Sequence, residues 1–282
     1  MKKFVVALLT LSLAMSFVGC SASETEEAAS TTAATEATVA TEATAATDET
    51  VSTEAVDTTE AVQDDAQSVD VMTYAEYAAA DLDTQVVVET YVQAKQSWWE
   101  DKATVYTQDE DGAYFLYEMA CSEEDYEKLT VGTKIRVTGY KSEWAGEVEI
   151  IEATFEILEG SYVATAVDAT EWLGTDELIN HQNEFVSFKG MTVEASTDAD
   201  GNEVAFLYNW DGSGQDGNDL YFNVSYNGET YTFTVESYLC DNTTDVYNAV
   251  KALNIGDTID MEGFLYWYEG VNPHITSVTV AE

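Results

Sequence analysis

Apolar and polar residues alternate in strand-length runs from residue 74 to the end of the chain. Because successive side chains of a β-strand point to opposite faces, this period of two predicts strands that are buried on one face. The first series of predicted elements comprises a strand at 85–95, a strand at 114–120, a helix at 122–129, a turn and strand at 131–140, and a strand at 146–158.

A second series repeats this order with a strand at 184–195, a strand at 231–239, a helix at 241–253, a turn and strand at 255–264, and a strand at 271–281. In both series a Cys is followed by a helix, a Leu, an apolar-Gly-polar-Thr turn, an alternating strand, a Gly and an aromatic residue, which indicates an internal repeat. With one further strand before the helix, the order becomes strand-strand-strand-helix-strand-strand, which is the order of the OB-fold, a five-stranded, partly open Greek-key barrel. We therefore predict an all-β chain with short helices, built as two tandem OB-fold five-stranded Greek-key barrels.

The second copy is longer than the first because it contains an extra hairpin. Asp198 to Glu203 has hairpin-turn composition, and Asp211 to Asp219 is a Gly-rich loop between the runs 205–210 and 220–226. Asn227-Gly228 predicts another tight hairpin. Between the copies, we expect a small helix at 176–180.

The N-terminus has the pattern of an export signal. Lys2 and Lys3 precede an apolar run from Phe4 to Val18, which has signal-peptide length and is too short for a comfortable membrane span. The run ends in Phe17-Val18-Gly19-Cys20, which resembles the lipobox of bacterial lipoproteins, although Phe17 stands where Leu is usual. We expect residues 1–19 to be removed and Cys20 to carry the lipid that holds the chain at the extracytoplasmic face of the cell membrane. The alternative is an ordinary signal peptide with an incidental Cys.

Residues 20–70 are predicted to form a disordered stalk behind this lipid anchor. From Ser21 to Asp70 the composition is almost wholly Thr, Ala, Glu, Ser, Val and Asp, without Gly, Pro, aromatic or basic residues. Such a segment cannot bury enough apolar surface to offset its backbone entropy, and no apolar stripe at helical spacing is sustained. The predicted barrels then occupy residues 71–160 and 161–282.

Three sequence segments of the predicted barrels resemble those of a known group of proteins: 109–115, 139–144 and 204–210. They are similar to the tandem OB-fold lipoproteins of Gram-positive bacteria, and the resemblance covers residues 74–282. It implies the OB-fold and a location at the cell surface. It brings no assigned activity.

The charge of the chain restricts its partners. The formal net charge is -44, and after residue 70 there remain 41 acidic against 8 basic residues. A field of this sign repels phosphate backbones, whose binding depends on Lys and Arg, so we expect nucleic acid to be disfavoured as a partner. Strong acidity also serves to keep an exported protein soluble.

Aromatic residues give the strongest indication of a binding site. OB-folds hold extended polymers on the face of strands two and three and on the adjoining loops. Aromatic side chains in such loops and at strand ends suit sugar stacking or a protein partner, although many of them can equally fill the barrels or the surface between them. The candidate ligand-binding residues are Trp98, Trp99, Trp144, Tyr208, Trp210, Tyr221 and Trp267.

Calcium is the only metal that the sequence suggests. Asp198, Asp200 and Asn202 alternate as oxygen ligands do in a calcium loop, but the distal bidentate Glu and the flanking helices of an EF-hand are missing. Asp211, Asp216 and Asp219 form a second cluster among glycines. Asp-Gly turns produce the same pattern in ordinary hairpins, and no other cofactor is indicated.

The sequence does not indicate an enzyme. The only histidines, His181 and His274, do not lie in a recognisable triad context, and clustered zinc ligands are absent from the sequence. We predict that Cys121 and Cys240 remain free buried thiols, because they occupy equivalent places in separate barrels. The chain is thus interpreted as a non-catalytic binding module for a carbohydrate or a partner protein at the cell surface. The alternatives are single-stranded nucleic-acid binding or a structural part of an envelope complex.

Overall fold

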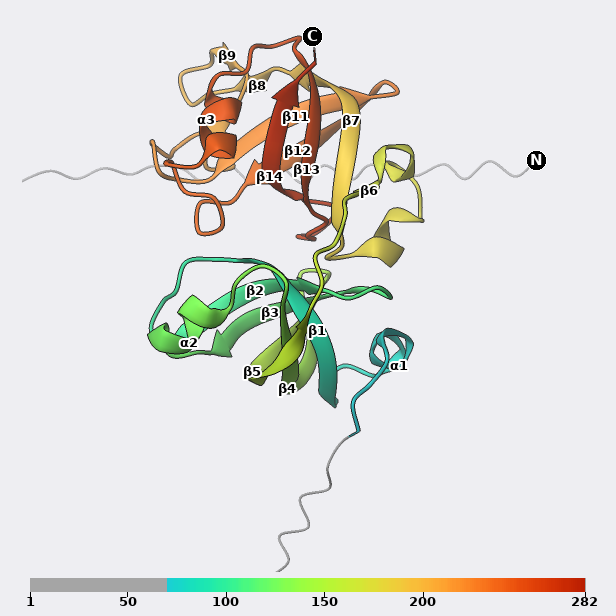
Figure 1. Ribbon diagram of the computed structural model, residues 1–282. Helices are drawn as coiled ribbons and strands as arrows, with labels where there is room; N and C mark the ends of the chain where they lie inside the picture. The colour runs from blue at the N-terminus through green and yellow to red at the C-terminus, as the bar shows by residue number, and fades with distance from the viewer. Residues whose placement is uncertain (1–69, 282) are drawn as a thin grey trace, which may run out of the picture. The chain divides into compact units, whose positions relative to one another are not determined.

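The computed structural model describes residues 70–281, and these fall within one compact unit (Figure 1). The predicted signal peptide, Cys20 and the stalk lie outside the described residues. Of the helices in the described part, none has the length and apolar character needed to cross a membrane.

The first barrel is a closed five-stranded circuit in the order β1-β2-β3-β5-β4, with β4 pairing back to β1. All neighbouring pairs are antiparallel except β3 and β5, which run parallel. A short helix, α1, precedes the barrel and begins at a capping box formed by Thr73 and Glu76. The bounds are α1 Tyr74–Ala79, β1 Gln85–Lys95, β2 Lys102–Gln108, β3 Ala113–Ala120, β4 Thr133–Trp144 and β5 Glu147–Ser161.

The second barrel closes through the equivalent circuit β7-β11-β12-β14-β13, since β11 pairs with β7 and β12 runs parallel to β14. The matching positions of β3 with β5 and of β12 with β14 show that the two copies share one topology. The prediction of two tandem OB-fold barrels is confirmed. The bounds are β7 Phe185–Glu194, β11 Leu220–Tyr226, β12 Glu229–Val235, β13 Thr258–Phe264 and β14 His274–Val280.

A helix stands between the third and fourth strand of each barrel, as predicted (Figure 1). Helix α2 (Glu123–Lys128) is capped by the Ser122 side chain and has acids in its first turn. Helix α3 (Asp245–Lys251) is capped by Thr244 and buries one face in the core of the second barrel.

The segments outside the barrel strands differ most from the sequence prediction. The run 205–210 forms only the two-residue strand β10, because Asn209 turns the chain with a φ of 58°. The expected helix at 176–180 is a single 3-10 turn, η2. Asn227 and Gly228 both have positive φ, as the predicted Asn-Gly hairpin requires. The remaining elements are β6 Val167–Asp168, η1 Thr170–Trp172, η2 Leu178–His181, β8 Ser196–Thr197, β9 Glu203–Val204 and β10 Leu207–Tyr208.

Each barrel has its own apolar interior. Leu116 and Ile135 are fully buried in the first, and Phe222 and Phe233 in the second. Cys121 and Cys240 are buried free thiols, which confirms that prediction. Burial raises the pKa of Cys121 to about 11, so this thiol stays protonated and unreactive at neutral pH.

A third apolar cluster joins the barrels. Tyr106 of β2 and Phe115 of β3 point outward from the first barrel, yet they are 0% and 3% exposed. Phe264 of the second barrel stacks on the Tyr106 ring at 4.5 Å, and Tyr266 lies edge-on to Phe115 at 5.4 Å. Part of the β2–β3 face, where OB-folds bind ligands, is therefore occupied by the second barrel.

Candidate functional site

The equivalent face of the second barrel, formed by β11 and β12, is open. Because side chains alternate along a strand, Phe222 enters the core while Tyr221 and Asn223 point outward. In the antiparallel register Tyr221 lies opposite Thr234, and Asn223 lies opposite Thr232. This face thus presents the Tyr221 ring and the side chains of Asn223 and Thr232, whereas Thr234 is 1% exposed and donates its hydroxyl to Asn272 Oδ1 at 2.7 Å.

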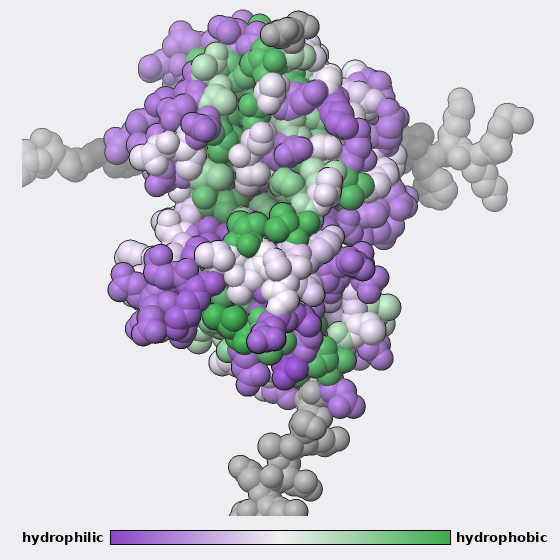
Figure 2. All heavy atoms as spheres, in the orientation of Figure 1, coloured by the Kyte–Doolittle hydropathy of each residue, from purple (hydrophilic) through white to green (hydrophobic). Residues whose placement is uncertain are grey.

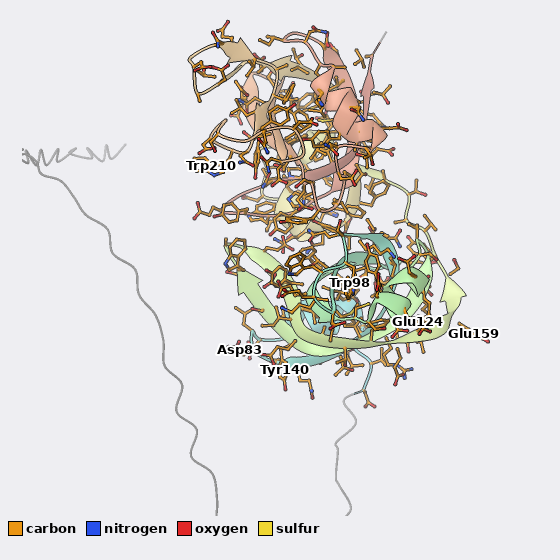
Figure 3. The ribbon with its side chains drawn as sticks, turned by 90° about the vertical axis from the view of Figure 1, so that its left-hand side faces the viewer. Asp83, Trp98, Glu124, Tyr140, Glu159 and Trp210 are labelled. Carbon is orange, nitrogen blue, oxygen red and sulfur yellow. The ribbon has the colours of Figure 1, made fainter. Side chains whose placement is uncertain are left out.

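Two loops place aromatic side chains beside this face. The connection from β7 to β11 brings Trp210, which is 75% exposed, and the segment between β13 and β14 brings Tyr268 and Asn272. Two adjoining hollows of about 550 and 600 Å³ share Trp210, Tyr221, Tyr268 and Asn272. Together they form what we call the β11–β12 groove. Figure 3 shows Trp210 projecting from the ribbon of the second barrel.

The floor of the groove is polar and deeply buried. Glu236 is 8% exposed, and its two carboxylate oxygens accept the backbone N–H groups of Tyr238 at 3.1 Å and Leu239 at 2.9 Å. Burial, reinforced by the charge of Asp219, raises the pKa of Glu236 to about 7. Burial lowers the pKa of His274 to about 3, so this imidazole is neutral at physiological pH.

The charges around the groove are of one sign. Asp219, Glu236 and Glu269 line the hollow that contains His274, and the other hollow is lined by uncharged residues. Among residues 70–281, no Lys or Arg lines either hollow. On the face shown in Figure 2, hydrophilic residues dominate both flanks of the molecule. The groove therefore suits a ligand without negative charge in contact with its floor.

Three of the predicted aromatic residues come together here. Tyr221 and Trp210 lie on the face and in the loop of the second barrel, and Trp144 reaches the same hollow from the end of β4. The Trp144 ring is 56% exposed, and its centroid lies 5.1 Å from that of Tyr268. The wall of the groove thus combines residues of both barrels.

The other four predicted aromatic residues lie elsewhere. Trp98 is half-buried and donates its indole N–H to the Cys121 carbonyl at 2.9 Å, within the outline of the first barrel in Figure 3. Tyr208 packs edge-on against Phe206, and Trp267 packs on the core of the second barrel. Trp99 is exposed and lines a separate hollow near Tyr117 and Tyr238.

Several residues of the groove were missed by the sequence analysis. Tyr268 belongs to a run of three aromatics from which only Trp267 was selected. Strand alternation from Tyr221 could have indicated Asn223, the next outward residue on β11. Pairing of β11 with β12 could then have indicated Thr232 and Thr234. The buried Glu236 and His274 have no sequence signal, because their positions depend on how the strands are paired. The missed residues are Asn223, Thr232, Thr234, Glu236, Tyr266, Tyr268, Asn272 and His274.

The carboxylates of the two predicted calcium loops bind other groups of the chain: Asp198 binds its own turn, whereas Asp216 and Asp219 bind residues outside their loop. Asp198 accepts the backbone N–H groups of Asp200 and Asn202 at 3.0 and 2.8 Å. Asp216 forms an ion pair with Lys251 at 2.5 Å, and Asp219 accepts the Ser237 hydroxyl at 2.6 Å. In the described part of the chain, no group of three or more Asp, Glu, His or Cys side chains is placed to hold a metal ion. The structure thus gives the calcium prediction no support.

A second buried carboxyl lies where the barrels meet. Glu147 is 0% exposed, and its Oε2 accepts the Trp267 backbone N–H at 2.9 Å while Oε1 has no partner in the described residues. Burial raises the pKa of Glu147 to about 8. The protonated carboxyl is therefore the form that suits this junction at neutral pH.

This carboxyl predicts a pH-dependent stability. The native state keeps a proton on Glu147 up to about pH 8, whereas a carboxyl in the unfolded chain loses it near pH 4.5, so the free energy of unfolding falls as pH rises between these values. We expect the free energy of unfolding of Glu147→Gln to exceed that of the wild type by up to about 5 kcal/mol at pH 9 and to match it near pH 4. Urea unfolding at both pH values measures the difference. Glu159→Gln, at an exposed position of the same strand, is the control, and equal gains in both variants would contradict the prediction.

The comparisons with known proteins concern the architecture alone. No family model and no curated protein matches the chain. A murine DNA-binding protein bound to dsDNA is 10% identical, with 70% of this chain and 96% of that chain covered and a TM-score of 0.34. A HINa domain in complex with a 20 bp dsDNA is 12% identical, with coverage of 71% and 96% and a TM-score of 0.31. A replication protein A heterotrimer bound to ssDNA is 10% identical, with coverage of 73% and 51% and a TM-score of 0.29.

These matches correct one expectation. The net charge led us to disfavour nucleic acid as a partner, but solved structures similar to this chain are complexes with dsDNA and ssDNA. The error was to judge the partner from the charge of the whole chain. A single strand is also held by stacking of its bases on aromatic side chains, which net charge does not report.

Proposed function

We propose that the chain is a non-catalytic binding module that holds a linear polymer in the β11–β12 groove, and that a neutral oligosaccharide is its first candidate ligand. The observation that carries the proposal is that the same three aromatic rings line both hollows of the groove: Trp210, Tyr221 and Tyr268. The groove lies on the strands and loops that OB-folds use for oligosaccharides and oligonucleotides.

The composition of the groove favours a sugar chain. The apolar faces of sugar rings pack on aromatic side chains, and the hydroxyl groups around their edges need neutral polar partners such as Asn223, Thr232 and Asn272. A neutral chain also avoids repulsion by Asp219 and Glu269.

Single-stranded nucleic acid is the second candidate, because exposed aromatic rings on this OB face also suit stacked bases. Since Lys and Arg are absent among the described residues that line the groove, phosphate neutralisation would contribute little to such binding. Its affinity would therefore not fall with added salt in the way that is usual for nucleic-acid binders.

One binding experiment separates the candidates. The full chain is titrated with neutral oligosaccharides of several linkage types and with poly-dT and poly-U at low and high salt. Oligosaccharide binding that is insensitive to salt supports the first candidate. Binding of the single strands alone replaces it with the second, and binding of neither class contradicts the proposal.

We also propose that the module is attached to the outer face of a bacterial membrane through a lipid on Cys20. The support is the apolar run that ends at this Cys and the polar segment that follows it. In an expression host fed with labelled palmitate, the wild-type chain should carry the label and partition with membranes, and Cys20→Ala should do neither. Cys121→Ala, which removes a buried thiol, should keep the label. An unlabelled wild-type chain would contradict the anchor.

A further inference from the structure

The floor of the β11–β12 groove contains a histidine with one unused ring nitrogen. His274 is 6% exposed and lines the hollow that Trp144 and Tyr268 enclose. Its Nδ1 lies 2.6 Å from the Tyr106 hydroxyl, and its ring stacks on Tyr266 at 4.2 Å. Among residues 70–281 no group forms a hydrogen bond with Nε2, and this atom is not among those sealed from solvent. The free edge of the ring is therefore available to a ligand.

The partner on the other edge determines which nitrogen carries the proton. Tyr106 is fully buried, and His274 Nδ1 is the one hydrogen-bond partner of its hydroxyl in the described chain. If the hydroxyl accepted a hydrogen bond from an Nδ1–H group, its own hydrogen would be left buried without an acceptor, which is costly. The Tyr106 hydroxyl therefore donates to Nδ1, and the neutral imidazole carries its hydrogen on Nε2.

An acceptor lines the same hollow. Glu236 is 92% buried, and the backbone N–H groups of Tyr238 and Leu239 hold its carboxylate in one orientation. A carboxylate has about four lone-pair sites, so two backbone donors leave acceptor capacity free. Thr234, two residues before Glu236, pairs directly with His274 in the β12–β14 ladder, which holds the two strands in register.

We propose that this floor is a subsite that recognises one hydroxyl group of a sugar ring, with His274 Nε2–H donating to the hydroxyl oxygen and Glu236 accepting the hydroxyl proton. The inference rests on the proposed function, because it names the feature of the oligosaccharide that the groove recognises. Tyr106 belongs to the first barrel, so it acts as a positioning residue for a site on the second.

A hydroxyl matches the subsite better than other polar groups do. It donates and accepts through one oxygen, which suits a donor and an acceptor that line one hollow. A phosphate only accepts, and it would meet the carboxylates of Asp219, Glu236 and Glu269. The rings of Tyr266 and Tyr268 are placed in the same hollow to contact the apolar face of the sugar that carries the hydroxyl.

The test compares a neutral oligosaccharide that the full chain binds with analogues that each lack one hydroxyl. We expect one deoxy analogue to bind the wild type about tenfold more weakly than its parent, as loss of a hydrogen-bonded group in a buried site does. His274→Ala should lose most of this preference, because only the contact with Glu236 then remains to the hydroxyl. His181→Ala removes the other histidine, which stacks on Trp172 outside the groove, and should keep the tenfold preference.

The outcomes separate this inference from the proposed function. If the wild type binds no oligosaccharide, the first candidate of the proposed function fails. If the wild type binds and His274→Ala keeps the preference for the parent, the subsite is overturned while the groove proposal stands. Binding of RNA in place of oligosaccharides, with a preference over DNA that depends on His274, would also overturn it, because the hydroxyl would then belong to ribose.

A second variant keeps the test decisive if His274→Ala does not fold. Tyr106→Phe removes the hydroxyl that fixes the tautomer but keeps the ring that packs on Phe264. It should weaken binding of the parent severalfold and leave binding of the deoxy analogue unchanged. A Tyr106→Phe variant that is folded, as judged by its melting temperature, and equally selective would overturn the proposal.

Discussion

The double variant Trp210→Ala/Tyr268→Ala is expected to bind a neutral oligosaccharide about 100-fold more weakly than the wild-type chain, with little change in its melting temperature. Both rings line the two hollows of the groove, and they are 75% and 47% exposed, so the barrel core does not depend on them. Truncation of one aromatic contact residue costs about 1.4 kcal/mol or more in binding, and two such losses give the factor of 100.

Isothermal titration of the variant with the ligand of the wild type measures this effect. Trp99→Ala is the matched control, because Trp99 is 66% exposed and lines a hollow that shares no residue with the groove. Equal losses in the double variant and in the control would place the ligand outside the groove. An unchanged affinity in both variants would show that these aromatic rings do not contribute to ligand binding.

The largest loss of stability is expected from Phe264→Ala. The Phe264 side chain is 3% exposed, stacks on Tyr106 of the first barrel and lies 5.3 Å from Phe185. Its removal leaves a cavity in the cluster that joins the barrels and costs about 3–5 kcal/mol. Because the two barrel interiors keep their own residues, the barrels should then unfold in separate transitions.

Calorimetry of the full chain provides the measurement for this prediction. The wild type should unfold in a more cooperative manner than Phe264→Ala, whose first transition moves to lower temperature. Tyr238→Ala is the control, since this aromatic residue of the second barrel is 66% exposed. A Phe264→Ala thermogram that superimposes on that of Tyr238→Ala would contradict the role of the cluster.

Local sequence patterns were sufficient to predict the repeat and the topology. The alternation in 85–95 and 271–281 and the capped helix after Cys121 depend on neighbouring residues, and both copies preserve their order. The run 205–210 was misjudged because its apolar residues alternate like a strand while Asn209 turns the chain. Strand alternation identifies the two faces of a strand, but it does not show whether the core, the other barrel or solvent covers each face.

That limit explains the partial success at the site. Trp210 and Tyr221 were found because the order of strands gives their place on the OB face. Trp98 and Trp267 have the same sequence character, yet tertiary packing directs them to the Cys121 carbonyl and to the core. The covering of Tyr106 by the second barrel and the burial of His274 arise from contacts between distant segments, which no local pattern contains.

The central claim is that the β11–β12 groove holds the ligand, and amide NMR of the isotope-labelled full chain tests it most directly. Upon titration with the oligosaccharide, the largest shift changes should occur at Asn223, Thr232 and Asn272, which line the groove. The amides of helix α2, on the first barrel, should remain unchanged. Shift changes confined to the hollow around Trp99, or to helix α2, would contradict the claim.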